Sequence, residues 1–279
     1  MGADAPFWMH NPSSQSLLML NSMAPSGSET AKFRVLGVRV DALQIPHAIA
    51  ILQGWIARRA GSHYVAVTGM HGVSESLVNP EFRAALDAAS LVVCDGMPLV
   101  WLGRLHGHDL RRRVYGPELM DTFCRHTGSR YRHFFYGGAP GVAEHLANVM
   151  QNRHGIQIAG TYTPPFRPLT AKEDQEAVAV IEAARPDVLW IGLSTPKQER
   201  WMYEHRDKLT VPAVLGVGAA FDLNTGRLQQ APRWMRENGL EWLFRLVAEP
   251  KRLWRRYLVQ GSKFVWNVLL ELTALRAYE

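Results

Sequence analysis

The chain has 279 residues, 47% of them hydrophobic, a formal net charge of +6 and two cysteines. This length suits one large α/β domain, alone or with an appendage, and the charge suits nucleic acid, an anionic membrane surface or a phosphorylated substrate. No apolar run approaches the ~20 residues that span a bilayer, and the N-terminus lacks a secretory-signal pattern. Cys94 and Cys124 form no C-x-x-C pair, which disfavours a disulfide framework or a structural zinc site and favours a reducing cytoplasm.

In chain order, residues 1–32 are rich in Ser, Pro, Asn and Met and predict a mostly disordered leader. Residues 33–41 predict a strand or short hairpin, and Pro46 begins a helix. Strands and helices then alternate, with strands expected at residues 64–68, 91–94, 133–136, 156–160, 187–193 and 211–217. We therefore predict a leader at 1–32, an α/β core at 33–225 and a basic amphipathic helical appendage at 226–279.

This alternation is typical of a mostly parallel sheet with helices on both faces. The predicted fold class is α/β, a Rossmann-like sheet plus a C-terminal helical appendage that associates with membranes. Open sheets of this kind bind ligands at the carboxyl ends of their strands. Polar residues that follow strands are therefore the first candidates for a site.

Asp95 follows the apolar strand 91–94 and precedes a helix that begins near Pro98. A carboxylate at this edge of the sheet can act on a ligand. It can equally cap the helix behind it. Thr68 ends the preceding strand in the same way.

Gly137, Gly138 and Gly141 lie in a turn between a strand and a helix. The unpaired N–H groups of a helix N-terminus bind phosphate. The turn lacks the full G-x-G-x-x-G spacing, and a plain connection uses the same glycines, so both interpretations stay open.

Two later strand ends carry further candidates. Thr195 and Glu199 fit a helix capping box, which leaves Gln198 beside the ligand edge as a group that can pair with a base or sugar. Gly218 and Asp222 follow the last strand, where a small residue lets the backbone approach a ligand.

Arg113 ends a run of three arginines and is expected to turn inward while the other two face water. None of the eleven histidines has a metal-binding spacing, and no D-x-D motif is present, so metal-free chemistry without a cofactor is predicted. No serine lies in a G-x-S-x-G elbow, which disfavours a serine hydrolase.

Residues 233–279 alternate cations with Trp, Phe and Leu at helical spacing. A basic amphipathic helix of this kind favours an anionic membrane surface. Its arginines can also close over a diphosphate, and the tail can instead pack on the sheet as an ordinary helical pair or bury a surface in a homo-oligomer. Nucleic acid is disfavoured, because bulky aliphatic residues crowd the cations and no known binding module is visible.

Seven short motifs occur in a fixed order: DGMP at 95–98, RVYG at 113–116, YGGAPG at 136–141, PKQERW at 196–201, GVGAAFD at 216–222, APRW at 231–234 and GLEW at 239–242. Together they resemble the WecG/TagA/CpsF family of bacterial glycosyltransferases (glycosyltransferase family 26), over about residues 33–258.

The resemblance implies an inverting, metal-independent enzyme that moves a hexose-type sugar from a UDP-sugar to a polyprenyl-diphosphate-linked glycan acceptor. It places the enzyme at the cytoplasmic face of the inner membrane, as a peripheral protein of cell-surface polysaccharide biosynthesis (exopolysaccharide, common antigen or teichoic linkage).

The resemblance also implies roles for individual residues. Asp95 matches the family's catalytic carboxylate and takes the acceptor proton, and Thr68 orients a substrate. The residues expected to bind substrate are Arg113, Gly137, Gly138, Gly141, Gln198, Gly218, Asp222, Arg245, Arg252 and Arg255. The chain departs from the family in having Thr68-Gly69-Met70 where Thr-x-Asn is common. The missing amide leaves glucose or an acidic hexose open as the donor sugar instead of N-acetylmannosamine.

Two rival functions remain from the sequence. A nucleotide-cofactor oxidoreductase would need a complete G-x-G-x-x-G and a ribose-binding acid about 20 residues later, and neither is clear. A non-catalytic membrane scaffold of a polysaccharide assembly would have no need of Asp95, Arg113 and Gln198 together.

Overall fold

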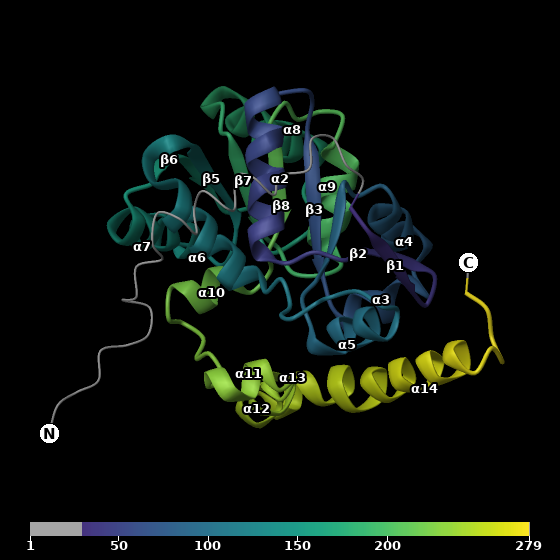
Figure 1. Cartoon of the computed structure of the whole chain (residues 1–279). Helices are drawn as coiled ribbons and strands as arrows, with labels where there is room; N and C mark the ends of the chain where they lie inside the picture. The colour runs from purple at the N-terminus through teal and green to yellow at the C-terminus, as the bar shows by residue number, and fades with distance from the viewer. Residues whose placement is uncertain (1–29, 279) are drawn as a thin grey trace, which may run out of the picture.

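The computed structural model describes residues 30–278 and forms one eight-stranded sheet of order β1-β2-β4-β3-β8-β7-β5-β6 (Figure 1). Neighbouring strands run parallel except for β1 and β2, which form an antiparallel hairpin at one edge. The strands are β1 (Lys32–Val35), β2 (Val38–Asp41), β3 (His63–Thr68), β4 (Leu91–Cys94), β5 (Arg132–Gly137), β6 (Gln157–Tyr162), β7 (Val188–Gly192) and β8 (Ala213–Gly216). The α/β class and the mostly parallel sheet are confirmed. The leader predicted at 1–32 lies almost wholly outside the described residues.

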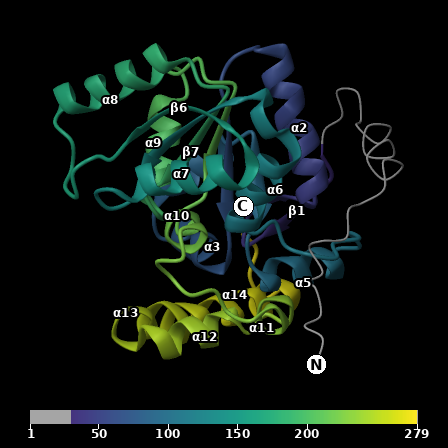
Figure 2. The same ribbon diagram turned by 90° about the vertical axis from the view of Figure 1, so that its left-hand side faces the viewer.

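Helices cover both faces of the sheet (Figures 1 and 2). Those of the α/β part are α2 (Ile45–Arg58), α3 (Met70–Ser76), α4 (Pro80–Asp87), α5 (Met97–Leu105), α6 (Gly116–Thr127), α7 (Val142–His154), α8 (Ala171–Ala184), α9 (Lys197–His205) and α10 (Ala220–Asn224), with a short 3-10 turn η2 (Gly128–Arg130). The helix α3 begins two residues after Thr68. Asn79 caps α4, because its side chain accepts a hydrogen bond from the Phe82 N–H at 3.1 Å.

Alternate residues of each strand reach opposite cores, as the two-residue period of a strand requires. In β5, Phe135 packs with α2, α6 and α7, whereas Phe134 and Tyr136 pack with α8 and α9 on the other face. In β7, Trp190 joins the first core and Leu189 the second. The central strands of the sheet are therefore buried on both faces, and their ends offer a ligand access to their backbone.

The last strand, β8, lies between β3 and β7; on one side of it the chain passes outward from β3 to β4, and on the other side it passes outward from β5 to β6, so the direction of the connections reverses there. The turns after β3, β4, β5, β7 and β8 all reach the same edge, because these strands are parallel. A crevice at such a reversal is the usual ligand site of an open α/β sheet.

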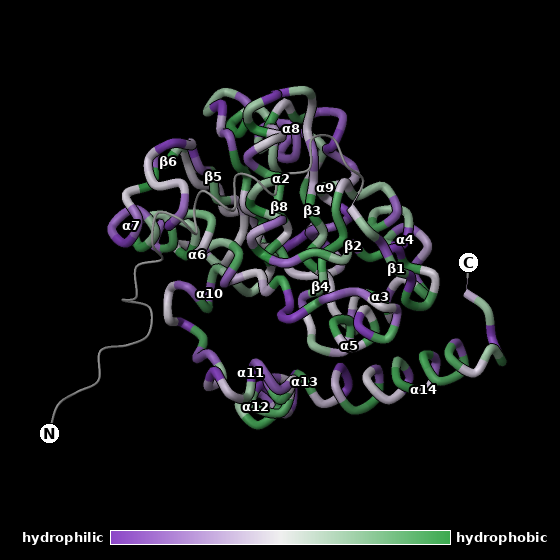
Figure 3. Tube along the Cα trace, in the orientation of Figure 1, coloured by the Kyte–Doolittle hydropathy of each residue, from purple (hydrophilic) through white to green (hydrophobic). Residues whose placement is uncertain are grey.

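The C-terminal helices lie across this edge of the sheet (Figures 1 and 2). They are α11 (Arg233–Glu237), α12 (Glu241–Ala248), α13 (Pro250–Trp254), a π-helical turn η3 (Arg255–Gln260) and α14 (Gly261–Leu272). Apolar and polar residues alternate along them (Figure 3). Within residues 30–278, no helix combines the length and the apolarity that a bilayer crossing requires.

The expected capping box at the start of α9 is wrong. Pro196 occupies the cap position without a side-chain hydrogen bond. The Thr195 hydroxyl donates instead to the Glu199 carboxylate at 2.8 Å. The two side chains that resembled a cap therefore bind each other beneath the ligand edge.

Candidate active site

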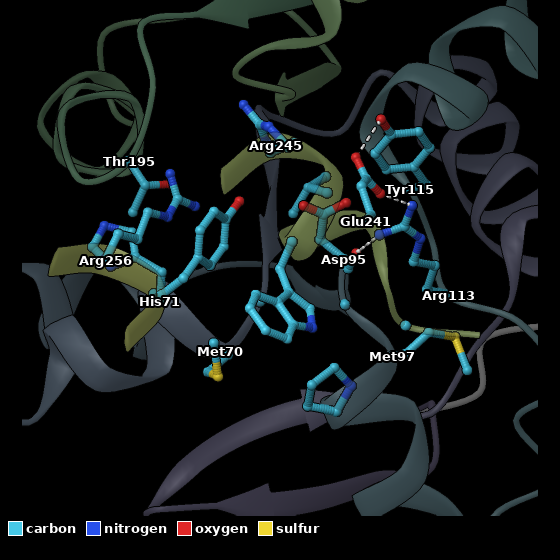
Figure 4. A pocket seen from close by; sticks show the side chains of 18 residues that line it. Met70, His71, Asp95, Met97, Arg113, Tyr115, Thr195, Glu241, Arg245 and Arg256 are labelled. Carbon is cyan, nitrogen blue, oxygen red and sulfur yellow. Dashed lines mark hydrogen bonds and ion pairs between the residues drawn. The ribbon is translucent and has the colours of Figure 1, made fainter. Parts of the chain in front are cut away.

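Asp95 lies at the carboxyl end of β4, on the floor of a cavity between the sheet edge and the C-terminal helices (Figure 4). It does not cap α5, whose cap residue is Gly96 and which has no side-chain cap. Its Oδ1 atom accepts a hydrogen bond of 3.3 Å from the N–H of Gly116, the first residue of α6. The backbone holds the carboxyl through one oxygen, and we name the space above it the Asp95 cavity.

Arg113 turns inward as predicted: 13% of its side chain is exposed, against 78% for Arg111 and 52% for Arg112. Its guanidinium donates to the Asp95 carbonyl oxygen at 3.1 Å and forms an ion pair with Glu241. The Tyr115 hydroxyl donates to the other Glu241 oxygen at 3.0 Å. Arg113 is thus neutralised by a carboxylate from α12, and it positions the Asp95 loop.

Burial raises the pKa of Asp95 to about 6, although the Arg113 cation acts in the opposite direction. Glu241 adds to the increase, and the Gly116 N–H and Arg245 oppose it. A carboxyl with this pKa is largely ionised at neutral pH and still has a useful affinity for a proton. These are the properties that a general base requires.

Two arginines of the tail reach the same cavity. Arg245 and Arg256 both line it, and within residues 30–278 neither has an ion-pair partner. The Nε atom of Arg256 is buried without a hydrogen-bond partner in the described part of the chain. Burial also lowers the pKa of Arg256 from its ordinary value. Unpaired, half-buried guanidinium groups are ready to receive an anion.

The other two predicted tail arginines lie differently. Arg252 lines the neighbouring cavity and pairs with Glu249 at 2.5 Å. Arg255 is exposed, stacks on the Trp254 ring at 5.3 Å, and lines none of the cavities described here. Its neighbour Arg256 lines the Asp95 cavity instead, and a contact of Arg255 with substrate stays a prediction.

A second cavity adjoins the first. Asp95, Thr195, Arg245 and Arg256 line both, and Gly218 lines only the second, which we name the Gly218 cavity. A third, the Gly138 cavity, shares Gly192, Ser194 and Asp222 with the Gly218 cavity. The three form a continuous path from Asp95 to the glycine turn after β5.

The glycine turn approaches this path through Gly138. Gly137, Gly138 and Gly141 all have positive φ values, of 119°, 77° and 80°. A side chain on Gly137 would lie 2.7 Å from the Gly192 carbonyl oxygen, so the strand end also needs a glycine for packing. Asp222 lies at the junction of the second and third cavities and pairs with Arg227 at 3.4 Å.

Gln198 lines the Gly218 cavity, and its amide is already engaged. The Gly218 N–H donates to its Oε1 atom at 2.9 Å, and its Nε2 atom donates to Glu199 at 3.0 Å. Burial raises the pKa of Glu199, whose second oxygen has no partner among the described residues. Gln198 therefore holds the turn after β8, and a direct contact with substrate stays a prediction.

Thr68, like Arg255, is a predicted site residue whose side chain does not line the cavities. Its buried Oγ1 faces α3: a Cβ atom on Gly72 would lie 2.0 Å from it. The hydroxyl does not line the Asp95 cavity, although the Thr68 carbonyl oxygen accepts a 2.8 Å hydrogen bond from the Asp95 N–H. The geometry supports Thr68 as a residue that fixes the Asp95 backbone, and its predicted contact with substrate stays untested.

Sequence reasoning missed three residues of the site: Tyr115, Glu241 and Arg256. The first two belong to motifs that the resemblance quoted, RVYG and GLEW, and that was the available signal. His71 also lines the Asp95 cavity, and burial lowers its pKa to about 4. Within residues 30–278, no group of three or more His, Cys, Asp or Glu side chains is arranged to hold a metal ion.

Comparisons with known proteins show which family the chain matches. The model of the glycosyl transferase WecG/TagA/CpsF family matches residues 33–278. The N-acetylglucosaminyldiphosphoundecaprenol N-acetyl-beta-D-mannosaminyltransferase of Bacillus spizizenii is 32% identical to this chain over 70% of it and 74% of its own length. Proteins of the same name are 30% identical in Bacillus subtilis, over 72% of this chain and 80% of theirs, and 26% identical in Staphylococcus aureus, over 82% and 89%.

Proposed function

Because the chain belongs to the WecG/TagA/CpsF family of glycosyl transferases, we propose that it moves a hexose-type sugar from a UDP-sugar to a polyprenyl-diphosphate-linked glycan acceptor. The observation that carries this proposal is the pairing of two unlike groups in one cavity. A carboxyl with a pKa of about 6 faces two arginines that have no ion-pair partner within residues 30–278.

The proposed reaction is a single displacement with inversion. Asp95 accepts the proton of the acceptor hydroxyl as its oxygen forms a bond to the anomeric carbon. The bond from that carbon to the diphosphate oxygen breaks, and its electron pair leaves with the UDP. Arg245 and Arg256 stabilise the charge that develops on the diphosphate, which is the larger electrostatic demand of the step.

The path of cavities suggests where each substrate lies. The nucleotide diphosphate occupies the Gly218 and Gly138 cavities, where glycine backbones and a helix N-terminus favour phosphate. The acceptor then enters the Asp95 cavity from the side of α3 and η3. No residue of this scheme needs a metal ion, because guanidinium groups supply the positive charge.

The donor sugar is the finer question. The relatives are named for the transfer of N-acetylmannosamine, whereas Gly69 and Met70 offer no side-chain amide after Thr68. We propose a hexose-type donor, with N-acetylmannosamine, glucose and an acidic hexose as the three candidates. A nucleotide-cofactor oxidoreductase is not supported by any feature of the path.

We also propose that the C-terminal helices rest on the cytoplasmic face of the membrane. Large apolar side chains are exposed along them, including Trp234, Trp242, Val247, Trp254, Leu258, Val265, Trp266 and Leu269. Exposed cations such as Lys251 and Arg255 lie among them. Trp beside Lys and Arg is typical of helices that lie in an anionic bilayer surface. The same residues would be buried if the tail instead formed a homo-oligomer.

The function is tested by incubating the full chain with membrane extracts and a panel of UDP-sugars, with mass analysis of the lipid product. One sugar should add one hexose unit to a polyprenyl-diphosphate glycan, and Asp95→Asn should give no product above background. Failure of every UDP-sugar with an acceptor-rich extract would contradict the proposal. Sedimentation with anionic vesicles, compared with the sedimentation velocity of the free protein, separates membrane docking from self-association.

A further inference from the structure

A separate cavity of about 410 Å³ lies between α3 and α14, away from the three cavities of the site. It lies on the seam where α14 passes beneath α3 in Figure 1. Seven polar residues line it, together with Leu77 and Val78: Ser74, Glu75, Gln260, Lys263, Asn267, Arg276 and Tyr278. A water molecule takes about 30 Å³ of liquid, so this α3–α14 cavity has room for a group much larger than a single water.

Two hydroxyls of residues that line this cavity are buried and have no hydrogen-bond partner in the described part of the chain. They belong to Ser74 and Tyr278. Buried polar groups without partners are costly and rare, and one explanation is a ligand that supplies the missing partner. Two of them around one cavity point to a polar ligand.

The charge of the cavity favours an anion. Lys263 and Arg276 are its two cations, and neither forms an ion pair with a residue between 30 and 278. The Arg276 guanidinium lies 4.9 Å from the centre of the Tyr278 ring. Glu75 is the one acid in the lining, and its Oε1 atom already accepts a hydrogen bond of 3.0 Å from Asn79. Two free cations, two hydroxyls and two amides match the donors that phosphate oxygens take in proteins.

The cavity continues the route by which an acceptor would leave the site. His71 of α3 lines the Asp95 cavity, and Ser74 lies about one helical turn further along the same helix. On the facing side, Arg256 and Tyr257 line the Asp95 cavity, and Gln260 lines the α3–α14 cavity. A long substrate with one end at Asp95 would therefore have its next groups on this seam.

We propose that the α3–α14 cavity binds the phosphate of a lipid, through Lys263, Arg276 and the Ser74 and Tyr278 hydroxyls. Two lipids carry that chemistry: the polyprenyl diphosphate of the acceptor and the headgroup of an anionic phospholipid. The choice between them rests on the proposed function, but the binding of phosphate does not, so the two can fail separately.

The first experiment measures the affinity of the full chain for inorganic pyrophosphate, with UDP present in excess to occupy the nucleotide path. Lys263→Gln and Arg276→Gln should each weaken binding about tenfold, the loss expected for one charge-assisted hydrogen bond. Lys251→Gln is the matched control, because it removes an equal charge from the exposed face of α13 and lines no described cavity. Equal affinities for all three variants and the wild type would overturn the proposal.

A second variant changes no charge. Tyr278→Phe removes a hydroxyl that has no partner among the described residues, so the melting temperature should stay the same or rise. Pyrophosphate affinity should nevertheless fall several-fold. A lower melting temperature with unchanged affinity would assign the hydroxyl to the fold and overturn its role in binding.

Two further measurements distinguish the acceptor diphosphate from a phospholipid headgroup as the bound phosphate. If the acceptor diphosphate binds here, Lys263→Gln should raise the KM for the lipid acceptor about tenfold and leave kcat nearly unchanged. If a phospholipid headgroup binds, the same variant should lose more affinity than Lys251→Gln for phosphatidylcholine vesicles that contain phosphatidylglycerol, with no difference on phosphatidylcholine alone. Either result supports the site, and neither effect beyond the Lys251→Gln control would contradict it. Asp95→Asn should lose transfer and keep its affinity for pyrophosphate and for the anionic vesicles, which separates this inference from the catalytic one.

Discussion

Arginine side chains lie on both sides of Asp95, paired with a carboxylate on one side and unpaired on the other. On one side, Arg113 is held by Glu241, the Asp95 carbonyl oxygen and the face of Tyr115, whose ring centre lies 4.1 Å away. On the other, Arg245 and Arg256 have no carboxylate partner in residues 30–278. A buried guanidinium that is fully paired is part of the structure, whereas one left unpaired at a cavity waits for an anion. The contrast assigns positioning to the first side and substrate charge to the second.

The largest expected effect is at the group between the two sides. Asp95→Asn removes the proton acceptor but keeps the size of the side chain and its place at the end of β4. Turnover should fall by about two to four orders of magnitude, the usual contribution of a general base, while UDP-sugar affinity changes little. Initial rates and isothermal titration measure the two quantities. A rate within twofold of wild type would exclude Asp95 as the base.

Arg256→Gln tests the unpaired side. It should lower kcat by about 10²-fold, as the loss of one group that stabilises transition-state charge does in other enzymes, without destabilising the fold. Arg255→Gln is the matched control, because it removes an equal charge one residue away on the exposed face. Equal losses in the two variants would show that the tail acts by net charge alone, and a larger loss at Arg255 would restore the prediction from the sequence.

Arg113→Gln tests the paired side and should act on stability first. It leaves Glu241 as a buried, uncompensated charge, and breaking such a pair costs about 3 kcal/mol or more. The double variant Arg113→Gln/Glu241→Gln should recover much of that loss, because no charge is left unpaired. Denaturant unfolding of the wild type, Arg113→Gln, Glu241→Gln and the double variant gives the coupling energy between the two side chains. Additive losses in the double variant would mean that the pair does not hold the Asp95 loop.

The smallest effect concerns the cost of keeping Asp95 ionised. Its pKa in the folded protein is about 6, above the ordinary value of 3.8, so the folded state binds the proton more tightly than the unfolded chain does. Its ionisation therefore destabilises the fold as the pH rises from about 4 to about 6, and the cost stays constant above that. Asp95→Asn should be more stable than wild type at pH 8, by about 1 to 3 kcal/mol, and equally stable at pH 4. The kcat/KM of wild type should rise through the same region near pH 6.

The sequence predicted the sheet well because buried parallel strands are short apolar runs between turn residues, and the runs at 91–94 and 188–192 read clearly as such. It also predicted which arginine of 111–113 turns inward, because only Arg113 adjoins an apolar stretch. Glu241 could not be singled out by pattern: an acid in the first turn of a helix is ordinary, and its partner Arg113 lies 128 residues earlier. Arg255 was named because the family resemblance matches it to a tail arginine. Arg255 and Arg256 both lie in the π-helical turn η3, whose irregular geometry a sequence pattern does not show, and Arg256 is the one that lines the site.

Thr68 and the glycine turn mark a different limit. Both were placed correctly at strand ends, and yet the Thr68 hydroxyl points at Gly72, while only Gly138 of the three glycines lines the path. The end of a strand fixes the position of a residue, and the direction of its side chain depends on the pleat and on what packs above it.

Through Glu241, the C-terminal helices influence the proton affinity of Asp95. The Glu241 carboxylate raises the proton affinity of Asp95, and so does the burial of the site under the C-terminal helices. Arg245, which lies on the same helix α12, lowers the proton affinity of Asp95. If α12 lifted away, burial and the Glu241 charge would go together, and Asp95 would drift back toward the acidity of a carboxyl in water. The strength of Asp95 as a base therefore depends on whether the C-terminal helices are in place. With these helices displaced, a bound donor sugar would lie beside a carboxylate that is too weak a base to promote its hydrolysis.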